Sequence, residues 1–247
     1  MNKPAYAIRQ GIYHSLHSIP CQDYVGWDGN GNVTAIALCD GAGSCKDSEK
    51  AAKYFAEKVP KLLCAGFDDL YSQTEQGDNA LLKQTFLNML RSDEEAQIFW
   101  NNDALTTLLF VAVRNDGCWI AGHIGDGVIL FQNEINTQTL SKPENGLTPS
   151  ETFFINEEPT YAAEHLRFYH NCSQGRIAFL LSSDGCENAL RRESGAPSDK
   201  ALQLFEDLYR YPATMSKELQ KYLDEYFAEL SEDDLSIGML HCLCGDE

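Results

Sequence analysis

The sequence predicts an α+β fold, in which antiparallel sheets are flanked by pairs of helices as the layers of a sandwich. Apolar, β-rich runs cluster at the start, the middle and the end of the chain. Amphipathic helical stretches come in two pairs, so strands and helices do not alternate strictly as they do in a parallel doubly wound sheet. No internal repeat, linker or shift in composition interrupts the 247 residues, and we expect a single domain over residues 1–247.

Hydrophobic periodicity predicts the individual elements. Apolar residues recur at helical spacing after Ser48, a residue type that favours helix N-caps, and again after Asn79. The turn signal Asn115-Asp116-Gly117 between two apolar runs indicates a hairpin. The expected strands are 5–9, 24–27, 33–39, 105–113, 118–124, 128–132, 176–182 and 235–242, and the expected helices are 48–63, 79–100, 198–210 and 215–230. Residues 133–160 are polar and too long for an ordinary connection, which makes them a candidate functional flap.

Composition and charge exclude several classes of protein. The chain has 19 Lys plus Arg and 37 Asp plus Glu, so 19 − 37 gives a formal charge of −18. This excess repels phosphate backbones and anionic lipid, and we expect neither nucleic acid nor membrane as a partner. Acidic groups of this kind hold divalent cations or attract basic protein segments. No apolar run is long enough for a membrane helix, and no apolar segment typical of a signal peptide follows Met1.

The cysteines indicate a cytoplasmic protein. Nine cysteines is an odd number, they are scattered along the chain, and no CxxC pair suggests a zinc site. We therefore expect reduced thiols that pack as small apolar side chains.

Carboxylates recur where apolar strands end. Asp40, Asp126 and Asp184 each stand beside a tight turn, Asp233 lies in an acidic run before the last strand, and Asp23 precedes another apolar run. One Asp-Gly pair is usually only a turn, SSDG alone can cap a helix, and EDD alone can be a solvated charge run. Together, however, such carboxylates repel one another unless a cation lies between them. Oxygen ligands of this type suit Mg²⁺ or Mn²⁺.

Six pieces of the sequence, in this order and across most of the chain, resemble the metal-dependent protein phosphatases of the PP2C type, in particular their bacterial branch. Each piece is weak by itself, and the specificity lies in the order of all six. The pieces are PCQDY, CDGAG, ALTTLLFVAV, AGHIGDGVIL, AFLLSSDGCEN and EDDLSIGML.

The resemblance implies a four-layer αββα sandwich whose two central, mainly antiparallel sheets hold a two-metal centre at one edge. It implies that Asp40 bridges two Mg²⁺ or Mn²⁺ ions and that Gly41 offers its carbonyl oxygen. Asp184 and Asp233 would complete the ligands of one ion, so Asp40, Asp184 and Asp233 are the expected catalytic residues.

Three further aspartates have counterparts in the family. Asp23 matches the N-terminal acidic position that holds metal-bound waters, and Asp126 matches the position of a third, looser metal in bacterial members. Asp234 stands where the family commonly has Asn, so we expect it to support the ligands rather than to bind metal.

The sequence departs from the family pattern at two places. Family members usually carry an Arg that grips the phosphate before the N-terminal acidic motif, whereas residues 11–20 contain none, and His14 or His17 is a candidate substitute. Animal-type members place a proton-donating His directly after the DG turn, where this chain has Ala42. The segment 149–154 is similar to the part of the family's flap that shapes substrate choice.

The leading functional hypothesis is metal-dependent hydrolysis of phosphoserine and phosphothreonine on proteins by a water activated between two metals. Such chemistry needs no nucleophilic side chain, and neither Cys39 nor Cys45 heads the C-x5-R loop of cysteine phosphatases. The missing Arg motivates an alternative, a catalytically weak binding or regulatory module. A hydrolase of small phosphorylated molecules or nucleotides is the third possibility, although the sequence has no GxxxxGK[ST] loop. The sequence makes no prediction of oligomeric state.

Overall fold

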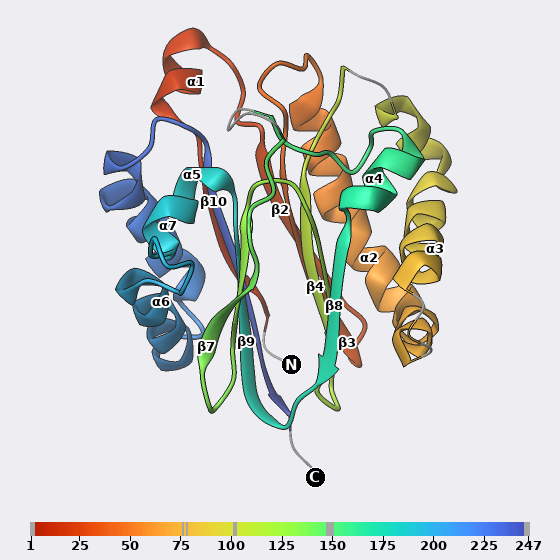
Figure 1. Ribbon diagram of the computed structural model, residues 1–247. Coiled ribbons are helices and arrows are strands. Elements are labelled where there is room, and N and C mark those ends of the chain that lie inside the picture. Colours follow the sequence, from red (N-terminus) through yellow and green to blue (C-terminus); the bar gives the residue numbers. More distant parts are fainter. Residues whose placement is uncertain (1–2, 76, 78, 101–102, 147–150, 245–247) are drawn as a thin grey trace.

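Two five-stranded antiparallel sheets form the centre of the molecule (Figure 1). The computed structural model describes residues 3–75, 77, 79–100, 103–146 and 151–244. The strands are β1 (Ala5–Arg9), β2 (Asp23–Gly29), β3 (Val33–Asp40), β4 (Leu108–Arg114), β5 (Cys118–Ile124), β6 (Val128–Gln132), β7 (Thr137–Ser141), β8 (Arg167–Cys172), β9 (Gly175–Ser182) and β10 (Leu235–Cys244). One sheet has the order β1-β10-β9-β6-β7 and the other the order β2-β3-β4-β5-β8.

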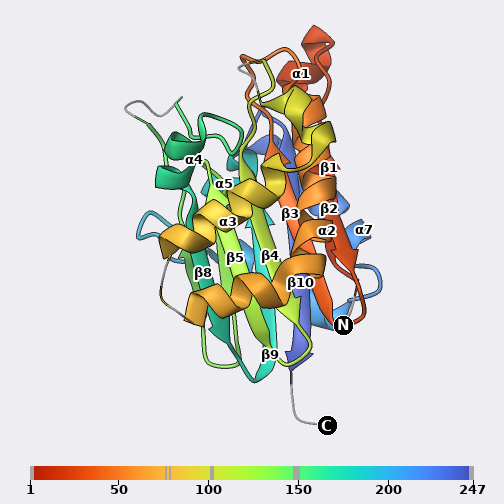
Figure 2. The same ribbon diagram turned by 90° about the vertical axis from the view of Figure 1, so that its right-hand side faces the viewer.

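Helices cover the outer face of each sheet. The α-helices are α1 (Ile12–His17), α2 (Ser48–Glu75), α3 (Asn79–Arg91), α4 (Pro159–His165), α5 (Asp184–Leu190), α6 (Asp199–Arg210) and α7 (Met215–Glu225), and the 3₁₀ helices are η1 (Glu94–Phe99) and η2 (Phe227–Glu229). Figure 2 shows α2 and α3 lying across the β2-β3-β4-β5-β8 sheet. Figure 1 shows α5, α6 and α7 beside the other sheet. The predicted αββα sandwich is confirmed.

The three interfaces between these four layers are apolar. Strand β3 contributes to two of these interfaces through alternate residues. Ala35 and Ala37 pack toward α2, whereas Ile36 and Leu38 pack between the two sheets. A strand buried on both faces has no polar side to show, which explains its continuous apolar run. Within the described residues, no helix combines the length and the apolar character that crossing a bilayer requires.

Several elements differ from the expectation. The first long helix continues through Pro60 to Glu75 rather than ending near Leu63, and the second ends at Arg91 before η1. The predicted flap region contains β7, which pairs with β6. Strand β8 was not predicted at all, and neither were the short helices α1 and α4.

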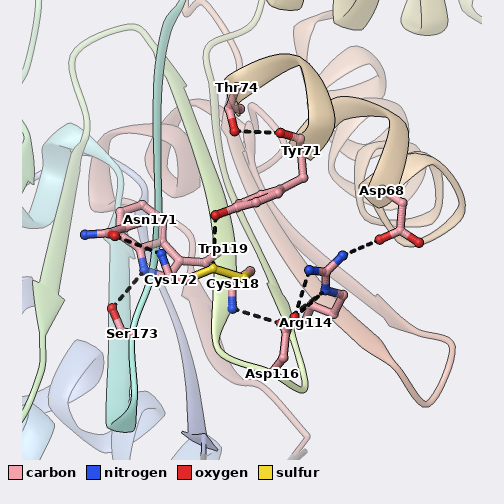
Figure 3. The surroundings of a disulfide bond; sticks show 10 residues. All are labelled: Asp68, Tyr71, Thr74, Arg114, Asp116, Cys118, Trp119, Asn171, Cys172 and Ser173. Carbon is pink, nitrogen blue, oxygen red and sulfur yellow. Dashed lines mark hydrogen bonds and ion pairs between the residues drawn. A yellow bond between two sulfur atoms is a disulfide. The ribbon is translucent and has the colours of Figure 1, made fainter. Parts of the chain in front are cut away.

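The expectation of reduced thiols is wrong for one pair of cysteines. Cys118 and Cys172 form a disulfide, and Figure 3 shows it at the end of the β5–β8 pair with the Tyr71 hydroxyl against Cys172. The two residues are direct partners in the register of β5 and β8, which brings their Cα atoms to 3.9 Å. Because β8 was missed, the sequence offered no reason to pair them.

Candidate active site

Four aspartates from separate parts of the chain line one cavity of about 450 Å³. Asp40 ends β3, Asp126 lies between β5 and β6, Asp184 begins α5, and Asp233 lies just before β10. One carboxylate oxygen from each of Asp40, Asp126 and Asp184 lies within 4.8 Å of the other two. Asp233 reaches the cavity but does not belong to that close group.

The segment before β4 fixes the backbone of Asp40. The Asp40 amide donates to Thr107 Oγ1 at 3.0 Å. The Asp40 carbonyl accepts from Thr106 Oγ1 at 2.9 Å and from the Thr107 amide at 2.8 Å. The paired threonines therefore hold the end of β3 from both sides.

The turns at Asp184 and at the start of β10 pack backbone against backbone. The Ser183 amide donates to the Ser236 carbonyl at 3.2 Å, and the Ser236 amide donates to Ser183 Oγ at 3.1 Å. A Cβ on Gly185 would lie 2.2 Å from the Asp234 carbonyl oxygen, so only glycine permits this approach. The glycine of the SSDG sequence is thus required for the two acidic turns to meet.

Burial and mutual repulsion disfavour the ionised form of this cluster. Burial, followed by the charges of Asp126 and Asp233, raises the pKa of Asp184 to about 7. Burial, followed by the charges of Asp23 and Asp184, raises the pKa of Asp40 well above its usual range. Burial also raises the pKa of Asp126. Because each shift penalises negative charge, a cation among these groups would stabilise all of them.

Asp23 lies outside the cavity lining. It is the direct partner of Asp40 in the β2–β3 register and is 3% exposed. Burial raises the pKa of Asp23 to about 8, although the hydroxyls of Ser236 and Ser183 lower it in part. Asp23 therefore lies beside Asp40 but outside the cavity lining, and its contact with metal-bound water stays a prediction.

The donor set of the cavity fits a hard divalent cation. Asp40, Asp126 and Asp184 present three carboxylate oxygens at one place, and Gly41 lies in the lining beside them. Oxygen-only sites of this kind suit Mg²⁺ and Mn²⁺ better than metals that prefer sulfur or nitrogen ligands.

The profile of the family described as Protein phosphatase 2C matches residues 10–226. The chain belongs to this family. No curated protein sequence matches the chain.

Solved structures of bacterial proteins, two of them described as phosphatases, share the fold. A bacterial serine phosphatase bearing a single point mutation is 12% identical and superposes with a TM-score of 0.62 over 100% of both chains. PppA of Pseudomonas aeruginosa, described as a regulatory component of T6SS, is 14% identical, with a TM-score of 0.61 over 97% of this chain and 96% of its own. The serine/threonine phosphatase Stp1 of Staphylococcus aureus is 14% identical, with a TM-score of 0.59 over 99% and 96%.

The two histidines proposed to replace the missing Arg of this protein phosphatase 2C chain lie in different places. His14 lines the cavity and is 8% exposed. His17 is exposed and outside the cavity lining, and its Nδ1 lies 2.7 Å from the Tyr13 carbonyl oxygen. The geometry therefore leaves His14 as the candidate for contact with a phosphate group.

Several residues that line this protein phosphatase 2C cavity were not predicted individually as site residues from the sequence. Thr152 and Phe154 come from the predicted flap segment, of which residues 149 and 150 lie outside the described residues. The remaining unpredicted side chains of the lining are Tyr13, Gln22, Ser44 and Thr107. Of these, Gln22 belongs to the quoted piece PCQDY and Thr107 to ALTTLLFVAV, and the contact of Thr107 with Asp40 explains why a threonine stands there.

Proposed function

We propose that the protein hydrolyses phosphoserine and phosphothreonine monoesters on proteins, with Mg²⁺ or Mn²⁺ as its cofactor. The observation that carries this proposal is the convergence of Asp40, Asp126 and Asp184 on one point of a cavity in a protein phosphatase 2C chain. The uncatalysed reaction is extremely slow, and positioning with charge neutralisation supplies most of its catalysis.

The residues take separate roles in this proposal. Asp40, Asp184, Asp233 and the Gly41 carbonyl would hold two cations, and Asp126 would hold a third. Bound cations supply a water of lowered pKa and neutralise the charge of the phosphate. The threonines that bond the Asp40 backbone and the glycine after Asp184 fix the chain segments that carry these two carboxylates.

Charge supports a protein substrate. With a net charge of −18, the chain attracts basic phosphorylated segments and repels free nucleotides. We therefore expect phosphopeptides with basic residues near the phosphorylated position to be hydrolysed faster than nucleoside phosphates.

Hydrolysis of a phosphothreonine peptide in the presence of Mn²⁺ tests the proposal. We expect turnover that EDTA abolishes and that Asp40→Ala lowers by at least about 10²-fold, whereas Asp69→Asn, an exposed aspartate of α2, leaves it unchanged. Activity that survives EDTA would contradict the proposal. Binding of the phosphopeptide in calorimetry without turnover would favour the alternative of a regulatory module, and faster hydrolysis of nucleotides would favour the small-molecule hydrolase.

A further inference from the structure

Hydrolysis of a phosphoserine leaves a serine oxygen that must gain a proton, because an alkoxide is a strong base. A side chain within hydrogen-bonding distance of the leaving oxygen can supply this proton as a general acid. Among the described residues that line the cavity, His14 is the one side chain able to carry a positive charge. It lies in a lining that is otherwise acidic or neutral, so its charge would also match that of a phosphate group.

A buried carboxylate holds the His14 ring. His14 Nδ1 lies 2.9 Å from Asp234 Oδ2, and the Asp234 side chain is 3% exposed. The Asp234 carboxylate also accepts from the Gly11 amide at 2.7 Å and from the Gln22 amide at 2.6 Å. Two backbone amides therefore fix the carboxylate that fixes the ring, and Nε2 is the ring nitrogen left for a ligand.

This arrangement differs from an accidental surface contact. Gly11 precedes α1, Gln22 precedes β2 and Asp234 precedes β10, so three chain segments meet at one carboxylate. A carboxylate in this position sets the orientation of an imidazole and leaves its other ring nitrogen facing the reaction partner. The pair thus holds an imidazole on a rigid support in the lining of the cavity.

The other polar side chains of the lining are weaker candidates. Gln22 Nε2 donates to Ser48 Oγ at 2.7 Å, and an amide is not an acid at neutral pH. Thr107 Oγ1 is engaged by the Asp40 amide. Tyr13 is 52% exposed, and a phenol is a much weaker acid than an imidazolium.

We infer that His14 is the proton donor to the leaving oxygen, and that Asp234 is its positioning residue; this inference rests on the proposed phosphatase function. Water adds to phosphorus and loses one proton to solvent. The phosphorus–oxygen bond to serine or threonine breaks, and its electron pair goes to the serine or threonine oxygen. That oxygen takes the proton from His14 Nε2, which leaves a free hydroxyl and inorganic phosphate. The neutral ring then regains a proton from solvent.

Substrates with different leaving groups separate this role from simple phosphate binding. The leaving group of p-nitrophenyl phosphate is a weak base that needs no proton, whereas a serine oxygen needs one. We expect His14→Gln to lower kcat on a phosphoserine peptide by roughly 10²-fold or more, and to lower it by less than about 10-fold on p-nitrophenyl phosphate. His17→Gln, on the same helix but outside the cavity, is the matched control and should change neither.

Asp234→Asn tests the positioning role with the same two substrates. The Gly11 and Gln22 amides bond different oxygens of Asp234, and asparagine keeps an acceptor for only one of them. Urea unfolding therefore first establishes that the variant is folded, and in the folded variant we expect the selective loss on the phosphopeptide to recur at smaller size. Equal losses on both substrates in His14→Gln, or no loss, would overturn the inference while the proposed function stands. Absence of turnover of both substrates by the unchanged protein would instead contradict the proposed function, and the inference with it.

Discussion

Asp184 shows how the surroundings of a carboxylate in this cavity set its pKa. Burial, together with the charges of Asp126 and Asp233, raises its pKa to about 7. Near neutral pH the side chain is therefore partly protonated until a cation compensates its charge. The same carboxylate destabilises the metal-free protein and would stabilise the metal-bound one.

Asp184→Asn should therefore have effects of opposite sign on stability. In EDTA at pH 8 we expect the free energy of unfolding to rise by at least about 1 kcal/mol, because the variant removes a buried negative charge. In saturating Mn²⁺ we expect it to fall below that of the unchanged protein, since one ligand is lost. Urea unfolding under both conditions measures the difference, with Asp69→Asn as the control. A loss of stability in EDTA would contradict this account.

The sequence predicted some residues of the site better than others. Asp40, Asp126 and Asp184 are recognisable because each follows or joins strands whose apolar runs are clear. His14 and His17 could not be told apart, since α1 has only 6 residues, too few for a hydrophobic periodicity that would assign their faces. The contact with Asp234 that separates them spans 220 positions of the chain.

Among the elements, the central strands were predictable, and so were the edge strands β1 and β2, whereas the edge strands β7 and β8 were not. β8, with the sequence RFYHNC, and β7, with the sequence TQTLS, each lie at the edge of a sheet. These two strands pair on one side only and are largely exposed or half-buried, so they lack the apolar run that marks β3 and β9. The polar stretch that we interpreted as a flap therefore includes part of a sheet.

The turn between β3 and α2 allows a matched test of close packing. A Cβ on Gly41 would lie 2.8 Å from the carbonyl carbon and oxygen of Ser48, the first residue of α2. We expect Gly41→Ala to lower the free energy of unfolding by about 1–3 kcal/mol, because the backbone of α2 must shift. At Gly43 of the same turn the nearest atom, Gln22 Oε1, is 3.7 Å away, so Gly43→Ala should stay within about 0.5 kcal/mol. Equal effects in urea unfolding would contradict this packing argument.

The disulfide between β5 and β8 should affect stability without affecting the site. Cys118 begins β5, whereas Asp126 follows the opposite end of this strand, so the bond is remote from the cavity. We expect Cys118→Ala combined with Cys172→Ala to cost about 2–4 kcal/mol, because the bond closes a loop of 54 positions. Phosphatase activity of the folded variant should be unchanged. Reduction should weaken the original protein and leave the variant unaffected, and a loss of activity in the variant would contradict this separation.

At the scale of the whole molecule, the site exists because both sheets end at the same place. Asp40 comes from one sheet, Asp184 follows a strand of the other, and Asp126 lies on the connection between the two sheets. Periodicity predicted the strands and the layers, and the order of the motifs indicated which strand ends belong together. Neither signal could show that Asp23 lies beside Asp40 and outside the cavity lining, because that position depends on the β2–β3 register.

The clustering of these aspartates should make the free energy of unfolding of the metal-free protein depend on pH. The pKa of Asp184 is about 7 and that of Asp23 about 8, both above the ordinary value of 3.8. Between the ordinary pKa of 3.8 and the raised pKa of each group, the folded state binds more protons than the unfolded state. The free energy of unfolding therefore falls as pH rises through this range. Buried His123, whose pKa is lowered from 6.5, has the opposite effect below about pH 6.5, which leaves pH 6.5 to 8 as the informative window.

In that window we expect the free energy of unfolding in EDTA to decrease steadily with pH, and to decrease less steeply in Asp184→Asn, which has lost one of the titrating groups. Saturating Mn²⁺ should remove or reverse the slope, because cations compete with protons for the same carboxylates and bind better as pH rises. Urea titrations at half-unit steps of pH measure all three curves. A slope that is the same with and without Mn²⁺ would mean that the acidic groups do not share a cation, and the physical basis of the proposed site would be lost.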